Sequence, residues 1–392
     1  MGTISDQRGA GARRIAFYAA AALALQVLFL AIWAVRYYAL HDYNAPMVGL
    51  DFAVFWSAAR VALEHGAASV FSPEWMQPLE AAIRPEFQYT PFPYPPTFLF
   101  AIAFFGAIPF GAALIAFLSC GLAAYGAMIT RLVSRLDSAI YLAVVAFPGA
   151  AVAIFFGQNS LFTAAAAGGA LMLLEGNSML AGVCIAALAI KPQLAVLFPL
   201  ALICERRWKA FAVAAAGTIA LVGASALAFG HGAWTAFFAY LPEFSRLMTE
   251  QRSTWGWMPT VFAACRLAGS SIGTAYLVQA LVAVPAVALM AYLWIRRARI
   301  ELRASALVIA TLLVQPYLMY YDLVWLVIPI AFLIRDARAR DLWPVEWGIL
   351  GAAWLMPVQG FLAIMLGVPV QLAPLVLIAL LVMVVRRPLA LA

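Results

Sequence analysis

The chain has 392 residues, of which 66% are hydrophobic and only 10% are charged. Soluble globular domains are roughly 45–50% apolar and about 25% charged, so this composition excludes that class and predicts a polytopic membrane protein. The net charge of +7 does not indicate nucleic-acid binding, because the basic residues are spread between apolar runs instead of forming one patch.

The chain begins with a short polar tail, residues 1–14, which we expect on the cytoplasmic side. The basic pair Arg13-Arg14 precedes an apolar run that is too long for a cleaved signal peptide, so we predict a first span from Ile15 to Val35. Residues 36–96 then form the longest polar interruption of the chain. We predict that they are the first extracytoplasmic loop.

This first loop contains signals for two short helices and a stiff return to the membrane. Phe52 to His65 has apolar residues at helical spacing, and Ser72-Pro73-Glu74 carries the start signals of a second helix. The stretch from Pro91 to Pro96 cannot form regular helix, since each proline lacks a donor and restricts the preceding residue. Asp51 lies just beyond the first span, and we hypothesise that the loop is an active-site lid with Asp51 as the base.

Apolar runs occupy most of the remaining chain. Thr97 to Ala107 is too short to span, and several later runs are shorter than the roughly 17 residues that a free-standing span requires. We expect these short runs to be broken helices that meet a water-filled cavity. The sequence therefore predicts an all-α membrane protein of about 12 transmembrane helices in a single domain, residues 1–392. The runs after Pro109 are Phe110 to Thr130, Ser138 to Phe156, Leu161 to Leu174, Met179 to Ile190, Leu194 to Cys204, Phe211 to Phe229, Ala275 to Ile295, Ala304 to Val314, Leu323 to Ile334, Trp347 to Leu366 and Leu372 to Val385.

The distribution of basic residues orients this layout. Placing the N-terminus in the cytoplasm puts most of the 24 lysines and arginines on the cytoplasmic side, in pairs and triplets beside spans. The positive-inside rule predicts this distribution, so we expect both termini in the cytoplasm and residues 230–271 as a second extracytoplasmic loop. The four cysteines stand singly, without metal-ligand spacing, and predict neither a disulfide framework nor a zinc site.

Several unusual polar residues share the predicted outer face, and each has an ordinary alternative. Asp51 and Asp322 can cap helices, and Lys191 can extend to the lipid headgroups. The pair Gln158-Asn159 can form a turn. For the other charged residues of this face, solvation in a loop is the default. These are His231, Arg246 and Arg252.

Together these residues are more informative than singly. A carboxylate that accepts a hydroxyl proton, beside cations that hold a phosphate, is the minimum set for displacing a phosphate leaving group with an alcohol. Aromatic residues of the two loops are suited to stacking on sugars, or form an interfacial belt. They are Phe52, Phe55, Trp56, Trp75, Phe92, Tyr94, Trp234, Phe237, Phe238, Tyr240, Trp255 and Trp257.

Five short motifs in order resemble the pattern of glycosyltransferase family 87, which includes mycobacterial polyprenol-phosphate-mannose-dependent α-mannosyltransferases. The motifs are DFAVFWSAA from Asp51, PFPYPP from Pro91, GQNS from Gly157, AG at 181–182 leading to IKP at 190–192, and PY at 316–317 with YDL from Tyr321. The resemblance covers the chain from about Asp51 to Arg335. It implies a GT-C architecture, a lipid-phosphate sugar donor and no general need for a metal.

By this resemblance Asp51 corresponds to the catalytic base, and Lys191 to a Lys-Pro position that we assign to the donor phosphate. The chain departs from the family at Tyr320-Tyr321-Asp322, where many members have a histidine-containing segment. The donor and substrate-binding candidates are Lys191, Gln158, Asn159, Tyr94, Tyr321, Asp322, His231, Arg246 and Arg252.

The resulting expectation is an inverting glycosyltransferase of a bacterial inner (plasma) membrane. It would transfer a sugar, mannose by resemblance, from a polyprenyl-phosphate donor to a lipid or glycan acceptor on the extracytoplasmic face, without a cofactor, a metal or nucleic acid. The alternatives are a flippase for lipid-linked sugars or another transporter, for which broken helices are equally natural, and a non-catalytic assembly protein. The catalytic hypothesis requires that Asp51, Lys191 and Asp322 line one cavity.

Overall fold

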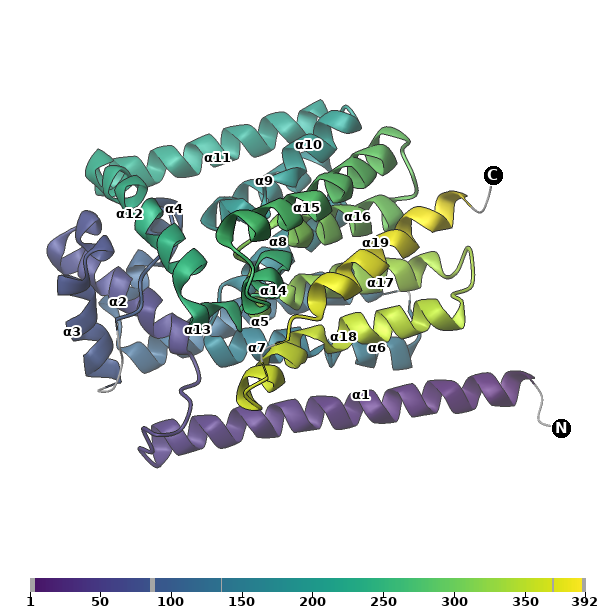
Figure 1. Cartoon of the computed structure of the whole chain (residues 1–392), viewed down its shortest axis with the longest axis horizontal. Helices are drawn as coiled ribbons and strands as arrows, with labels where there is room; N and C mark the ends of the chain where they lie inside the picture. The colour runs from purple at the N-terminus through teal and green to yellow at the C-terminus, as the bar shows by residue number, and fades with distance from the viewer. Residues whose placement is uncertain (1–3, 85–88, 135, 369, 390–392) are drawn as a thin grey trace.

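A computed structural model describes residues 4–84, 89–134, 136–368 and 370–389, and all regular structure within these ranges is helical, as predicted. Its apolar helices make the chain a membrane protein. Figure 1 shows most of the longer helices lying along a common direction. The α-helices are α1 (Ile4–Ala34), α2 (Leu50–His65), α3 (Pro73–Ile83), α4 (Pro96–Ile102), α5 (Phe110–Val133), α6 (Ser138–Val145), α7 (Pro148–Phe156), α8 (Ser160–Leu173), α9 (Ser178–Ala187), α10 (Leu197–Cys204), α11 (Trp208–Phe229), α12 (His231–Glu250), α13 (Arg252–Trp255), α14 (Val261–Leu267), α15 (Ile272–Ile295), α16 (Ile300–Val314), α17 (Val327–Asp336), α18 (Pro344–Met365) and α19 (Ala373–Leu389).

Among the described residues, six helical stretches are long and apolar enough to cross a bilayer. They are Arg13–Ala39, Phe110–Val133, Ser138–Phe156, Trp208–Phe229, Ile272–Ile295 and Pro344–Met365. Shorter apolar helical stretches lie between them, at 96–107, 160–173, 178–190 and 192–204. These four are below the usual spanning length, so the total of about twelve spans stays a prediction.

Prolines interrupt the predicted apolar runs at defined points. The run from Ser138 to Phe156 divides into α6 and α7, because Phe147 takes a non-helical conformation before Pro148, which begins α7. The chain between α9 and α10 passes through two 3₁₀ turns, Leu188–Ile190 and Pro192–Leu194, with Lys191 between them in a non-helical conformation. The backbone is therefore irregular where the candidate lysine lies.

The centre of the bundle is the polypeptide from α16 to α17. Nearly every residue of α16 is buried, as are most residues of the 3₁₀ segment Tyr320–Leu326 and of α17. Helices α7, α8, α15, α18 and α19 pack around them. Helix α1 lies at the edge of the bundle, along α6 and α7, with only 6% of its most apolar window buried (Figure 1).

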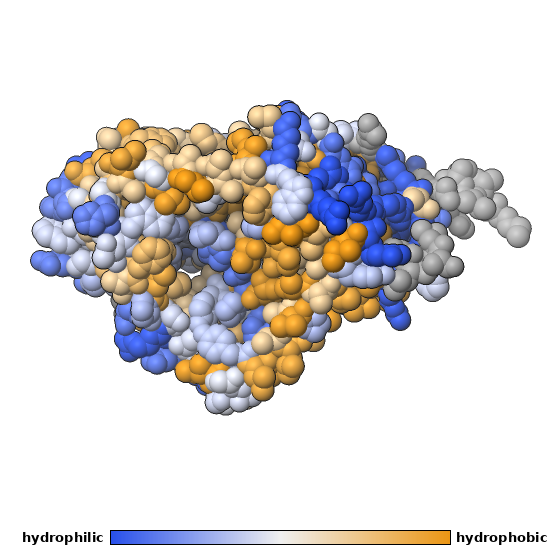
Figure 2. Space-filling view, turned by 90° about the horizontal axis from the view of Figure 1, so that it is seen from above, coloured by the Kyte–Doolittle hydropathy of each residue, from blue (hydrophilic) through white to orange (hydrophobic). Residues whose placement is uncertain are grey.

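The two ends of the bundle differ. Figure 1 shows both chain ends at one end, and α2, α3 and α12 at the other. The end with the termini carries a network of arginines and acids: Arg387, only 1% exposed, donates to Asp336 at 2.6 Å, and Arg303 donates to Glu175 at 2.7 Å. Figure 2 shows hydrophilic residues at this end and hydrophobic residues over the middle of the viewed face.

The first predicted loop contains the two helices expected of it, α2 and α3, and Pro73 begins α3. The segment Pro91–Pro95 is not helical, as the prolines predict, and Pro95 has an extended conformation. The second predicted loop contains a 20-residue amphipathic helix, α12, which the sequence analysis did not predict. Helix α12 packs on the 3₁₀ turn Ala67–Phe71 of the first loop.

Candidate active site

Two glycines bring the start of α2 against the turn between α7 and α8. Gly49 precedes α2 with a φ of +89°, and Gly157 ends α7 with a φ of +69°. Residues with a Cβ rarely adopt these backbone conformations. The Gly49 amide donates to the Phe155 carbonyl at 2.8 Å. A Cβ built on Gly157 would lie 2.7 Å from the Phe52 Cβ and 2.8 Å from the Gly49 Cα. The close approach places Asp51 next to Gln158.

A hydrogen-bonded chain of three side chains begins at Asp51. The Gln158 amide nitrogen donates to Asp51 Oδ2 at 2.6 Å, and the Tyr94 hydroxyl donates to the Gln158 amide oxygen at 3.1 Å. The orientation of the Gln158 amide is therefore fixed from both sides. The arrangement holds one carboxylate oxygen of Asp51 and leaves the other available for a substrate proton.

The environment of Asp51 disfavours its charge. Burial raises the pKa of Asp51 from 3.8 to about 6, against the hydrogen bond from Gln158 and the positive charge of Lys191, which lower it. The negative charge of Asp322 adds to the rise. A carboxylate with this pKa is a stronger base than an exposed one and remains ionised at neutral pH.

A buried ion pair forms the second part of the site. Lys191 Nζ lies 2.7 and 2.8 Å from the two oxygens of Asp322, and the Ser160 hydroxyl donates to Asp322 at 2.8 Å. Lys191 is 4% exposed and Asp322 is 2% exposed, so water does not screen the pair appreciably. The Lys191 ammonium also lies 4.9 Å from the ring centre of Tyr321 and 5.9 Å from that of Tyr94.

Both parts of the site face one cavity of about 1210 Å³, whose lining includes Asp51, Lys191 and Asp322. Gln158, Tyr94 and Tyr321 also line it. Pockets for one drug-sized ligand are roughly 300–1,000 Å³, so this cavity has room for two substrates side by side.

The rest of the cavity lining comes mainly from α12 and from the segment between α1 and α4. Helix α12 contributes residues from Phe237 to Met248, and the segment between α1 and α4 contributes Phe71 and residues from Tyr89 to Pro95. Of the aromatic residues singled out in the sequence, Phe55, Tyr94, Phe237 and Tyr240 line the cavity. Others serve the fold instead: Phe52 is fully buried, and the indoles of Trp56 and Trp255 donate to backbone carbonyls.

The structure places the remaining candidates away from the cavity lining. His231 is exposed at the start of α12, and Arg252 is exposed at the start of α13. Arg246 is exposed and pairs with Glu243 at 2.7 Å and with Glu250 at 3.7 Å. Asn159 is fully buried behind Gln158 and does not line the cavity.

Sequence reasoning missed two contributors to the site. Ser160 was quoted only as part of a motif, although its position at the start of α8 lets it bond Asp322. Glu80 of α3 is fully buried and accepts from the Thr90 amide at 2.9 Å, which fixes the segment that forms the cavity wall. Burial raises the pKa of Glu80 to about 7. In the part of the chain that the structure describes, no cluster of three or more His, Cys, Asp or Glu residues suits a metal ion.

Comparison with known proteins gives one match. The family model for glycosyltransferase family 87 matches residues 92–316, which is more than half of the chain. The matched stretch includes Tyr94, Gln158 and Lys191, and it lies between Asp51 and Asp322 in the sequence. No curated protein and no solved structure matches the chain.

Proposed function

Since the chain belongs to glycosyltransferase family 87 and is therefore a transferase of sugars, we propose that it moves mannose from a polyprenyl-phosphate donor to a lipid or glycan acceptor, with inversion and with Asp51 as the general base. Membership of a transferase family favours this enzyme over the flippase alternative. The observation that carries the proposal is the shared cavity, in which a carboxylate of raised pKa faces a buried ammonium. These are the groups that a displacement at phosphate-activated carbon needs.

The base step follows from the position of Asp51. Its free oxygen accepts the proton of an acceptor hydroxyl as that oxygen attacks the anomeric carbon of the donor sugar. Gln158 holds the other oxygen at 2.6 Å, so the carboxylate does not need to reorient when the acceptor arrives. Attack from the face opposite the phosphate inverts the anomeric carbon.

The leaving group is assigned to Lys191. As the bond between the anomeric carbon and the phosphate oxygen breaks, its electron pair remains on the phosphate and adds negative charge there. Two of the three ammonium donors of Lys191 point to Asp322, which leaves one for a phosphate oxygen. Lys191 is only 4% exposed, and charge contacts are stronger in buried surroundings.

The acceptor is assigned to the wall formed by α12 and the segment between α1 and α4. Phe237, Tyr240 and Phe55 offer aromatic faces, and Glu243 is the acidic group of α12 in the lining. His231, Arg246 and Arg252 lie outside this lining, so a phosphate role for any of them requires its side chain to move inward when the donor binds.

The membrane orientation is part of the proposal. Basic residues of α1, α19 and the α15–α16 and α17–α18 connections gather at the end with both termini, which supports a cytoplasmic position for that end. The cavity then opens toward the extracytoplasmic face. A lipid-phosphate donor suits that location, because it does not depend on a supply of nucleotide sugars.

The test is sugar transfer by the purified protein in nanodiscs. The protein is given radiolabelled polyprenyl-phosphate mannose and a crude membrane extract as acceptor, and the unmodified chain is compared with Asp51→Asn. Asp42→Asn is the matched control, because Asp42 lies in the same outer segment, outside the cavity, in a partly exposed pair with Arg36. Transfer that is lost only in Asp51→Asn supports the proposal. Transfer from a polyprenyl-phosphate arabinose but not from the mannose donor would overturn the choice of sugar.

A further inference from the structure

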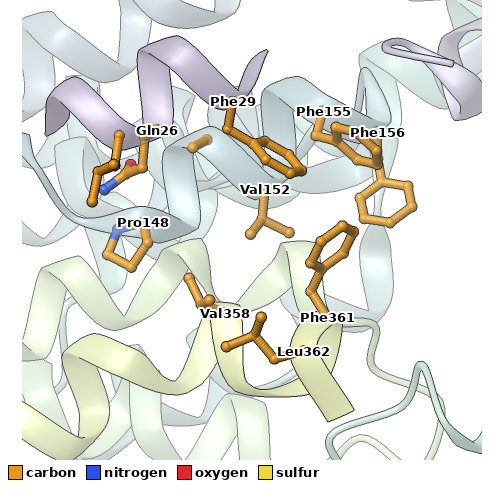
Figure 3. A pocket seen from close by; sticks show the side chains of 11 residues that line it. Gln26, Phe29, Pro148, Val152, Phe155, Phe156, Val358, Phe361 and Leu362 are labelled. Atoms are coloured by element: carbon orange, nitrogen blue, oxygen red, sulfur yellow. The ribbon is translucent and has the colours of Figure 1, made fainter. Parts of the chain in front are cut away.

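A second hollow lies beside the active-site cavity, on the membrane-facing side of the bundle. It has a volume of about 210 Å³ and is lined by α1, α7 and α18. Figure 3 shows Phe29 of α1, Val152 and Phe155 of α7, and Val358 and Phe361 of α18 around it. All three helices belong to the stretches that are long and apolar enough to span a bilayer. We call this hollow the α1–α7–α18 groove.

The groove is chemically suited to an apolar chain. Its lining is hydrophobic except for Gln26, and the amide of Gln26 already donates to the Ala146 carbonyl at 2.9 Å. A polar ligand would lose its hydrogen bonds to water here without replacement, which is costly. Four phenylalanines in the lining present flat apolar faces: Phe29, Phe155, Phe156 and Phe361.

The groove leads to the active site along α7. Pro148 lies in the lining near the start of the helix, Phe156 lies in it at the end, and Gln158 follows two residues later in the active-site cavity. The Phe156 ring is 5.8 Å from the Tyr321 ring, and Tyr321 in turn packs under the Lys191 ammonium. Phe156, which lines the groove, therefore contacts Tyr321, which lines the active-site cavity beside the proposed phosphate position.

From this adjacency we propose that the α1–α7–α18 groove binds the isoprenoid chain of the donor lipid. The inference rests on the proposed function, since it takes Lys191 as the site of the donor phosphate. A phosphate at Lys191 places the first isoprene units at the Phe156–Tyr321 pair, and the chain then follows α7 into the groove. The chain enters from the bilayer between α1 and α18, so the donor reaches the site without leaving the membrane.

A groove-filling variant tests the inference by the length of the donor chain. In Val358→Trp the new side chain occupies the groove. We expect it to raise the KM for undecaprenyl-phosphate mannose at least about tenfold, as a lost methylene contact in an apolar pocket does. The KM for geranyl-phosphate mannose, whose chain is too short to follow α7, stays unchanged. Val284→Trp is the matched control, because Val284 faces outward on α15 and is 68% exposed.

Two results of this kinetic comparison overturn the inference. An equal rise of the KM for both donors in Val358→Trp means that the variant disturbs the active site and not the binding of the isoprenoid chain. An unchanged KM for the long donor means that its isoprenoid chain does not bind in the groove.

A binding measurement separates this inference from the proposed function. Polyprenyl phosphate with a photoreactive group in its chain is crosslinked to the protein in nanodiscs, and the labelled peptides are mapped. We expect label on α1, α7 and α18, displaced by unlabelled polyprenyl phosphate and not by excess phosphatidylglycerol. Label spread evenly to α11 and α15, or displaced by phosphatidylglycerol, identifies an ordinary lipid contact and overturns the inference. Correct labelling without any sugar transfer would instead refute the proposed function and support the groove.

Discussion

Replacing Asp51 with Asn should stabilise the protein while it abolishes transfer. Asn keeps the shape of the side chain and an oxygen that accepts from Gln158, but it carries no charge and cannot take a proton. Loss of a general base lowers the rate by about 10²–10⁴-fold. The stability gain follows from the burial that raises the pKa of Asp51 from 3.8 to about 6. A rise of this size corresponds to roughly 3 kcal/mol, the extra cost of keeping the ionised form in the folded protein.

The pH dependence follows from the sign of this change. The folded protein binds the Asp51 proton more tightly than the unfolded chain, so the stability of the unmodified protein falls as the pH rises from 3.8 to about 6. Above that window the full cost is present, and Asp51→Asn avoids it. The apparent Tm of the variant in detergent should therefore exceed that of the unmodified protein at pH 8, with a smaller difference at pH 5. In the same window, kcat/KM of the unmodified enzyme should fall as the pH is lowered through about 6, because Asp51 becomes protonated.

Two outcomes would refute this reasoning separately. An Asp51→Asn variant that transfers sugar at the original rate removes Asp51 as the base. A variant that is inactive but less stable at pH 8 than the unmodified protein would mean that the Asp51 charge stabilises the fold, in contradiction to the burial argument.

Three further predictions concern residues around the site and at the far end of the bundle. Lys191→Met leaves the Asp322 carboxylate buried without its cation, so it should lower the free energy of unfolding by about 3–5 kcal/mol and abolish donor binding. Combining it with Asp322→Leu should restore the apparent Tm but not the binding, which is measured with the photoreactive lipid. Gly157→Ala places a Cβ in contact with backbone at a residue of left-handed conformation, and it should lower kcat while lowering the Tm only slightly. An unchanged kcat would show that the turn adapts. Arg387→Met leaves Asp336 with one arginine fewer and should lower the Tm, while the protein that remains folded keeps its KM and kcat.

The helical architecture was predictable because the signals for each helix lie within the stretch of sequence that forms it. Apolar runs and prolines place the helix ends within a few residues: the run predicted at Phe110 to Thr130 is α5, Phe110–Val133, and the run at Ala275 to Ile295 is α15. The amphipathic α12 was not anticipated, because polar residues and Pro242 interrupt its apolar pattern. Its packing on the 3₁₀ turn Ala67–Phe71 stabilises it, and that contact joins residues far apart in the sequence.

The sequence indicated which residues form the site better than it indicated which contacts they make with one another. Asp51 and Lys191 are conspicuous because charges are rare in this chain. The direct bond from Lys191 to Asp322 joins residues 131 positions apart, and the sequence holds no local sign of it. Gln158 was recognised as a polar turn residue, but its contact with Asp51 depends on how closely two backbone segments approach.

The contact between Gly49 and Gly157 has a consequence for how the protein can evolve. Any single-base change in a glycine codon that alters the residue yields one with a Cβ, or a stop. At Gly157 such an atom meets the Gly49 Cα at 2.8 Å, and at Gly49 it meets the Leu114 side chain at 2.8 Å. No single-base substitution at Gly157 therefore avoids a clash with backbone. At Gly49 the clash is with the flexible Leu114 side chain, which a second substitution can repack. Both glycines also have a positive φ, +89° at Gly49 and +69° at Gly157, so a substitution is strained at either position. We therefore expect related chains to retain both glycines, and Gly157 more strictly, because there the added Cβ meets backbone.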